Sequence, residues 1–197
     1  MEGRQPATIR LEMWRAQPPA ASRLYGALFS NEEPQREEFP RTITEFVSLL
    51  VVEEPNAEPV PHTDLINSLT FERTARPGQG SLTSEPTTGL QLVLISPKDP
   101  AADQDLRDWA DFVHIRHIAE AAVPGFRMIT PYVNVSSDGP RFLHLYEMHT
   151  DGPEAAFQDM TPRVAERLGG RESEAFAEWA WHPQLRIDYV NTFRRVP

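Results

Sequence analysis

Residues 103–126 read DQDLRDWADFVHIRHIAEAAVPGF, and this stretch decides how the second half of the chain folds. Several of its residues recur at spacings of three and four, which places them on one stripe of a helix with 3.6 residues per turn. They are Leu106, Trp109, Ala110, Val113, His117, Glu120 and Ala121. Pro124 and Gly125 end the helix, because proline cannot continue it and glycine favours its end. The stretch therefore predicts one helix that packs a single face on a neighbouring layer.

Strand patterns lie on both sides of this helix. Residues 90–95 form a compact apolar run that Ser96 and Pro97 stop, which is typical of a strand covered on both faces. Residues 126–133 and 141–148 are two further apolar runs, separated by a Ser-Asp-Gly-Pro turn. Such a turn between two strand patterns predicts a β-hairpin.

The chain closes with a second helical region and a last strand. The helical region begins near Pro153, is expected to break at Pro162 and resumes over 172–179, because an interior proline removes a backbone hydrogen bond. Residues 185–193 have the pattern of a strand. The order is therefore strand, helix, strand, strand, helix, strand, which predicts an α+β fold of the ferredoxin-like βαββαβ type.

The composition changes before this domain. Residues 78–89 are rich in Gly, Pro, Ser and Thr and have no apolar periodicity. We therefore predict a linker there, between an N-terminal segment at 1–77 and the ferredoxin-like domain at 90–197. In the N-terminal segment, 8–14 alternates like a half-buried strand, whereas 43–52 is either a short helix or a buried strand.

The two parts of the chain end in similar sequences. The first closes with LTFERTARP at 69–77 and the second with NTFRRVP at 191–197. This similarity leaves two alternatives open for the N-terminal segment. It is either a degenerate second half-barrel of the same fold or an elaboration packed on the ferredoxin-like domain.

Charge and composition exclude several classes of function. The formal net charge is −10, which would repel nucleic-acid phosphates and anionic membrane surfaces. The sequence has no cysteine, so disulfides, thiolate nucleophiles and thiolate metal sites are excluded. It also has no apolar run near the roughly 18 residues of a membrane helix, and its start lacks the apolar stretch of a signal peptide. We therefore expect a cytoplasmic protein that binds neither nucleic acid nor membrane.

Two short motifs resemble EthD-like members of the dimeric α+β barrel proteins. Residues 109–126, which contain HIAE and VPGF, resemble the first helix of that family and the turn after it. Residues 141–148, RFLHLYEM, resemble its third strand and lead into DGPEA at 151–155. The resemblance covers about half of the chain. It implies two four-stranded sheets that close into a barrel across a dimer, with a cavity between sheet and helices in each protomer.

The sheet itself also predicts a homodimer. Its strands have two apolar faces and helices can cover only one of them, so a partner sheet is expected to bury the other. The family that the sequence resembles includes cofactor-free monooxygenases, polyketide cyclases, lactone isomerases and haem-handling enzymes. Fold alone does not choose among these activities.

His117 and Glu120 are the first candidates for catalysis. Both belong to the predicted helical stripe, one turn apart, and would then face the sheet. An imidazole titrates near neutral pH, and a neighbouring carboxylate can orient it, so the pair suits general acid or base catalysis. The alternative is a histidine in the core or at a dimer contact, with Glu120 reaching solvent.

His144 and Tyr146 are the second candidates. Alternate residues of a strand share one face, so these two side chains point the same way. They line the cavity beside His117 if that face lies under the helix, and they fill the barrel if it does not. In the cavity they would position a substrate oxygen. Further predicted walls for substrate are Trp109, Val113, Tyr132 and Trp181.

Metal and cofactor sites are not predicted. His114 and His117 are three residues apart and could share a metal with His144 or His149, but His114 lies to the side of the stripe. Exposed histidines are the favoured interpretation, with haem ligation by His117 as the alternative. The pair of glycines around Gln79 lacks the remaining features of a nucleotide-binding loop.

These observations lead to two alternative functions. The first is a cofactor-independent cyclase, isomerase or monooxygenase, for example of secondary metabolism, that acts on a hydrophobic carbonyl-containing or aromatic metabolite by histidine-mediated proton transfer. The second is a non-catalytic binding or accessory protein that uses the same cavity. Polar groups within an apolar cavity favour the enzyme, and a purely apolar lining favours the binding protein.

Overall fold

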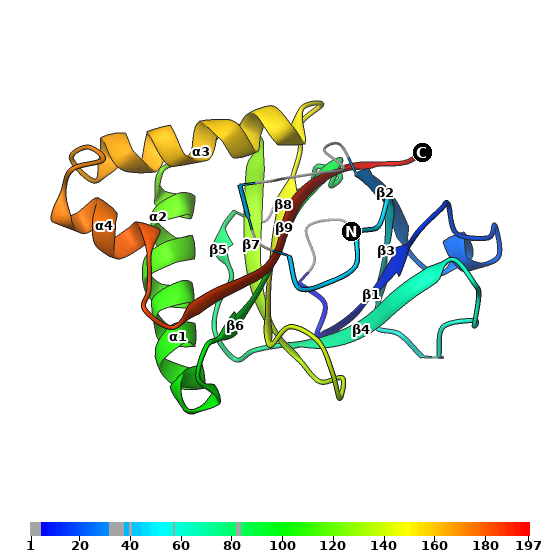
Figure 1. The fold of residues 1–197 in the computed structure, drawn as a ribbon. Coiled ribbons are helices and arrows are strands. Elements are labelled where there is room, and N and C mark those ends of the chain that lie inside the picture. Colours follow the sequence, from blue (N-terminus) through cyan, green and yellow to red (C-terminus); the bar gives the residue numbers. More distant parts are fainter. Residues whose placement is uncertain (1–4, 32–37, 40, 57, 82–83) are drawn as a thin grey trace.

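Eight antiparallel strands close into a barrel within this single chain. The computed structural model describes residues 5–31, 38–39, 41–56, 58–81 and 84–197. Around the barrel the strands follow the order β4-β1-β3-β2-β9-β6-β8-β7, and pairing of β7 with β4 completes the circle. Among the described residues the α-helices cover one side only, and the N-terminal strands, with the short 3-10 turn η1 (Ser22–Leu24), form the opposite side (Figure 1). The molecule is thus an α+β barrel built asymmetrically.

Each half of the barrel comes from one half of the sequence. The N-terminal strands are β1 (Thr8–Trp14), β2 (Ala27–Asn31), β3 (Ser48–Glu53) and β4 (Leu65–Arg73). The C-terminal strands are β6 (Gly89–Pro97), β7 (Phe126–Asn134), β8 (Phe142–Met148) and β9 (Leu185–Arg195). The two-residue strand β5 (Gln79–Gly80) pairs with β7 outside the circle. The strands predicted at 8–14, 90–95, 126–133, 141–148 and 185–193 are confirmed, and the ambiguous 43–52 contains a strand.

Within the residues that the structure describes, the α-helices all belong to the C-terminal half of the sequence. They are α1 (Asp103–Trp109), α2 (Ile115–Glu120), α3 (Pro153–Arg167) and α4 (Glu174–Ala180), and α1 joins α2 through a π-helical turn, η3 (Ala110–His114). Two short 3-10 turns, η1 (Ser22–Leu24) and η2 (Pro100–Ala102), complete the elements. Among the described residues, no helix is long and apolar enough to span a bilayer.

The break expected at Pro162 is wrong, because α3 runs through it. Pro162 is exposed, so water can replace the backbone hydrogen bond that it removes. The helical region breaks instead after Arg167, where Gly169 and Gly170 adopt φ values of +90° and +103°. Such left-handed backbone ends helices and favours glycine.

The two halves share strand order and register. In the C-terminal half Leu90 pairs with Phe193 on one side and Glu147 on the other. In the N-terminal half Ile9 pairs with Phe71 and Glu53 in the same positions. The orders β4-β1-β3-β2 and β9-β6-β8-β7 are also the same when each half is numbered from its own first strand. Equivalent residues can therefore be assigned across the barrel.

Apolar side chains from both halves fill the barrel. The largest buried cluster joins residues of β1, β2, β3 and β4 to residues of β6, β7, β8 and β9, with Tyr132 among them. Aromatic packing crosses between the halves, since Phe46 stacks on Phe193 at 5.6 Å and on Tyr189 at 5.0 Å. The partner sheet that we expected from a second protomer is thus supplied by the N-terminal strands of the same chain.

The predicted linker at 78–89 takes part in the fold. Apart from residues 82–83, which lie outside the described residues, it contains β5, and Ser81 N donates to Arg127 O at 2.7 Å. Gly80 has φ +122°, and a Cβ there would lie 2.2 Å from Arg127 O, so this close approach requires glycine.

Candidate functional site

The π turn η3 decides which side chains of the first helical region face the sheet. A π turn holds one more residue than an α-turn, so every residue after it moves by one position around the helix. Leu106 and Trp109 are buried before the turn, and Ile115 and Ile118 are buried after it. The continuous stripe that we predicted is therefore wrong beyond Ala110.

A cavity of about 240 Å³ lies between the sheet and the helices. Strands β6, β8 and β9 form its floor, and α1, η3, α3 and α4 form its walls. Its aromatic walls are Phe39, Trp109, Phe157, Phe176 and Trp179. Its polar side chains are Gln91, His114, His144, Tyr146 and Thr161. Phe39 comes from the N-terminal half and packs edge-on against Phe157 with ring centroids 6.4 Å apart.

His144 is held by a buried carboxylate. Its Nε2 lies 3.0 Å from Asp111 Oδ1, and both side chains are almost fully buried. The other carboxylate oxygen, Oδ2, accepts a hydrogen bond from Arg76 Nη1 at 3.1 Å. Because a carboxylate accepts and does not donate, His144 carries its proton on Nε2 in this contact. Nδ1 is then the nitrogen that His144 has left for a ligand.

Arg76 joins the N-terminal half to this site. It follows β4 in the chain and crosses to α1, where it also pairs with Asp108 at 2.5 Å. Its guanidinium lies 4.8 Å from the ring centre of Phe112, and its side chain is only 14% exposed. Arg76 therefore supplies, together with Arg107 at 3.8 Å from Asp111 Oδ2, the positive charge that a buried Asp111 requires.

His114 lies in the opposite wall between two tryptophans. Its ring is parallel to that of Trp179, with an interplanar angle of 5° and centroids 5.1 Å apart, and it lies 5.0 Å from Trp109. Its Nδ1 lies 3.0 Å from Trp179 O. Burial, with a smaller contribution from the nearby His144, lowers the pKa of His114 to about 4, so the ring is neutral at physiological pH.

Gln91 and Tyr146 form the polar floor of the cavity. They are paired across β6 and β8, so their side chains are neighbours on one face. Oε1 of Gln91 is buried without a hydrogen-bond partner among the described residues. Burial raises the pKa of Tyr146 well above its usual value, so its hydroxyl stays protonated.

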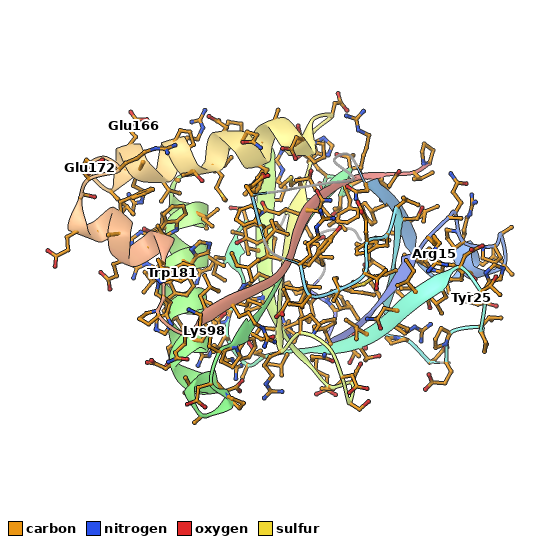
Figure 2. All side chains as sticks on the ribbon, in the orientation of Figure 1. Arg15, Tyr25, Lys98, Glu166, Glu172 and Trp181 are labelled. Atoms are coloured by element: carbon orange, nitrogen blue, oxygen red, sulfur yellow. The ribbon has the colours of Figure 1, made fainter. Side chains whose placement is uncertain are left out.

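The structure separates the predicted site residues into two groups. His144, Tyr146 and Trp109 line the cavity, which places the first two under the helices and not inside the barrel. Val113, His117, Glu120, Tyr132 and Trp181 do not line it. Tyr132 belongs to the barrel core, and Trp181 is 55% exposed, beside Lys98 at the surface (Figure 2).

The geometric argument for His117 and Glu120 is therefore wrong. Their side chains are near each other, with His117 Nδ1 and Glu120 Oε2 3.4 Å apart, but the π turn carries them away from the cavity. Glu120 instead pairs with Arg116 and Arg167, whose hydrogen bonds lower its pKa to about 2. This is a surface ion cluster between α2 and α3.

Sequence reasoning missed Asp111, Arg76, Gln91 and the role of His114. Asp111 lies off the predicted stripe and looks like a solvated charge until the π turn is known. Arg76 is 35 residues from Asp111, and no local spacing links the two. The one available signal was Gln91, a polar residue within an apolar strand pattern.

Metal and haem do not fit these residues. Within the described part of the chain, no group of three or more His, Asp or Glu side chains is placed to hold a metal ion. A porphyrin needs far more room than about 240 Å³, which is already below the usual range of ligand pockets. No arginine or lysine lines the cavity to pair with haem carboxylates, so far as the described residues extend. We derive no reaction step through either group.

Comparisons with known proteins give the fold. No protein-family model matches the chain, and no curated protein matches it. An anthrone oxidase-like protein matches with a TM-score of 0.55 at 11% identity, over 100% of this chain and 94% of that one. A mutant chlorite dismutase from Candidatus Nitrospira defluvii, in complex with cyanide, matches with a TM-score of 0.54 at 8% identity. This match covers 98% of this chain and 92% of that one.

A dimeric chlorite dismutase from Nitrobacter winogradskyi matches with a TM-score of 0.50 at 13% identity, over 95% of this chain and 99% of that one. Identities this low show the fold alone. They do not single out the EthD-like group that the motifs resemble. The chain has the fold of the dimeric α+β barrel proteins, with both four-stranded sheets in one polypeptide.

Proposed function

We propose that this chain is a cofactor-independent enzyme that acts on a hydrophobic, carbonyl-containing aromatic molecule by histidine-mediated proton transfer. The observation that carries the proposal is the contact of His144 with a buried Asp111 in the wall of an apolar cavity. A histidine whose second nitrogen is held by a carboxylate is oriented as a proton acceptor.

The proposed step is removal of a proton from a carbon next to, or conjugated with, the carbonyl group. Nδ1 of His144 takes the proton, and Asp111 stabilises the imidazolium that results. The protonated hydroxyl of Tyr146 donates a hydrogen bond to the enolate oxygen as negative charge develops there. The apolar walls keep water away from the carbanion, which strengthens both contacts.

The choice of test compound follows from the fold comparison. One similar structure is described as anthrone oxidase-like. Anthrone is an uncharged aromatic ketone with an acidic methylene group, so it has the chemistry that the proposed step requires. In a monooxygenase, dioxygen would then convert this methylene to a carbonyl and release one molecule of water.

The experiment separates proton removal from oxidation. Anthrone is incubated with the protein in D₂O without oxygen, and methylene exchange is followed by NMR against the uncatalysed rate. His144→Asn should lower the catalysed exchange by roughly 10²-fold to 10⁴-fold. His117→Ala, outside the cavity, is the matched control and should leave it unchanged. Binding of anthrone without catalysed exchange would favour the alternative, a non-catalytic binding protein.

The homodimer predicted from the sequence now requires a different kind of interface. One similar structure is described as dimeric, and we retain the homodimer as a proposal. Because the barrel closes within the chain, the interface would lie on an outer surface and not on an open sheet. Sedimentation velocity at micromolar concentration tests it, and a strict monomer would exclude it.

A further inference from the structure

The tautomer of His114 is fixed by its neighbour. Its Nδ1 lies 3.0 Å from the carbonyl oxygen of Trp179, and a carbonyl oxygen only accepts. The proton of the neutral ring is therefore on Nδ1. In return, Nε1 of Trp179 donates to His114 O at 3.1 Å, which holds the two residues together. The ring has no freedom to turn over without breaking this contact.

The second nitrogen of His114 is left as an acceptor. Nε2 makes no hydrogen bond to the described residues, and His114 lines the cavity. The low pKa of the ring means that Nε2 stays unprotonated across the physiological range. The cavity wall therefore contains a neutral imidazole with an unused acceptor, whose ring centre lies within about 5 Å of two tryptophan rings.

Two further atoms of the lining residues are acceptors. In the neutral ring of His144, whose Nε2 proton goes to Asp111, Nδ1 is an acceptor. Oε1 of Gln91 is a buried acceptor without a partner among the described residues. A ligand that only accepts hydrogen bonds would leave these atoms unpaired, and each unpaired buried acceptor is costly. A carboxylate ligand would also meet no arginine or lysine in the described lining.

We propose that His114 is a recognition site for a hydroxyl group, and that the ligand is an uncharged aromatic molecule that donates this hydroxyl hydrogen to His114 Nε2. Trp109 and Trp179 provide flat apolar surfaces beside that nitrogen, where an aromatic ring can stack. The inference rests on the proposed function, because it names the substrate class of the same cavity. It assigns His114 to binding and leaves proton removal to His144.

Three matched probes test the proposal. They are β-naphthol, its methyl ether and β-naphthoate, which share one ring system and differ in the hydroxyl hydrogen and in charge. Isothermal titration calorimetry measures the affinity of each for the full chain. The wild-type protein should bind β-naphthol at least about 10-fold more tightly than the ether or the carboxylate.

Two variants locate the recognition atom. His114→Phe keeps a ring that can stack on Trp179 and removes the acceptor, so its preference for the hydroxyl over the ether should fall to within about 2-fold. His114→Gln restores an acceptor and should recover part of the preference. His182→Phe is the matched control, because His182 lies 5.5 Å from Trp109 but does not line the cavity. Circular dichroism confirms that each variant is folded.

The outcomes are distinct from those of the exchange experiment. Equal affinity for the alcohol and the ether in the wild type, no binding of any probe, tighter binding of the carboxylate, or an unchanged preference in His114→Phe would each overturn the proposal. A hydroxyl preference that depends on His114, in a protein that does not exchange the anthrone methylene, would leave recognition intact and reject the catalytic proposal. Recognition by His114 and catalysis by His144 can therefore each be rejected without rejecting the other.

Discussion

The two halves of this barrel have the same strand order and register but different outer surfaces. At the equivalent outward positions of the third strand of each half, His144 and Tyr146 correspond to Leu50 and Val52. The C-terminal half places its pair under helices, where a cavity remains. The described part of the N-terminal half has no α-helix, and its pair packs with Trp14 and Leu28 in a small apolar cluster. The helices, and not the sheet, therefore create the site.

The buried polar and charged side chains also differ between the two halves of the barrel. Gln91 in the cavity floor corresponds to Arg10 on the side opposite the α-helices. Arg10 lies against Glu12, with Nη2 and Oε1 2.9 Å apart, and both side chains are nearly buried. An ion pair and an apolar cluster occupy these positions in one half, whereas in the other half the equivalent residues line a cavity. Burial of polar atoms without partners is tolerated where a ligand can supply them.

The largest expected effect tests whether the halves share one core. Phe71 and Phe193 are equivalent, and both are fully buried inside the barrel. Phe71→Ala and Phe193→Ala should each lower the free energy of unfolding by about 3–5 kcal/mol, since each leaves a cavity. Urea denaturation followed by fluorescence and circular dichroism should show one transition. Two separate transitions in either variant would mean that the halves fold independently.

The next effect concerns a pair of equivalent glutamates. Burial raises the pKa of Glu147 to about 7, although the hydroxyl of Thr87 partly offsets the effect by donating to the carboxylate. The ionised form is thus disfavoured in the fold. Wild-type stability is full at acid pH, below the unfolded-state pKa, and falls as pH rises through about 7.

Glu147→Gln removes this dependence. The free energy of unfolding of this variant should exceed that of the wild type by on the order of 3 kcal/mol at pH 8 and should equal it at pH 4. The free energy of unfolding in urea, measured across that range, checks the prediction. Glu53→Gln changes the equivalent, half-buried residue in the other half. An equal gain there would show that the effect does not depend on burial of Glu147.

A smaller effect tests the contact that joins the halves at the site. Arg76→Ala should lower kcat by about 10-fold, because Asp111 loses a charged hydrogen bond and holds His144 less firmly. KM should change less, since Arg76 does not line the cavity. Arg76→Lys should recover part of kcat, and Arg116→Ala on α2 is the control. Equal losses of kcat in both alanine variants would reject the positioning role.

The smallest effect concerns the surface opposite the α-helices. Leu24 is 80% exposed and adjoins Tyr25, which lies at the end of the molecule away from the helices (Figure 2). Leu24→Ser should change the free energy of unfolding by less than about 0.5 kcal/mol and leave probe affinity unchanged. A change in sedimentation would instead show that this surface takes part in a dimer.

The sequence predicted the C-terminal half better than the N-terminal half. Strand and helix periods alternate clearly after residue 89, and their order follows from them. In the N-terminal half β2 has only five residues, and β4 was noticed only through the similarity of 69–77 to the end of the chain. Short strands give too few alternations to identify a period. Closure of the barrel depends on pairing between distant strands, which no local pattern contains.

The site was predictable in part for a related reason. The alternation of β8 correctly placed His144 and Tyr146 on one face, and the first helical turns correctly placed Trp109. Asp111 and His114 depend on the π turn, which arises from packing and leaves no periodic signal. Arg76 depends on a contact between chain segments that only the fold brings together.

The π turn also has a consequence for how homologous sequences are aligned. It behaves as a one-residue insertion that the helix absorbs without a loop, so that Ile115 and Ile118 still reach the core. A relative with a regular helix would require a gap of one residue between positions 110 and 114. An ungapped alignment would pair every later residue of the helix with a residue one position away from its true equivalent. A functional role would then be assigned wrongly to His117. Alignments across this helix should therefore be anchored on the buried isoleucines and not on the histidines.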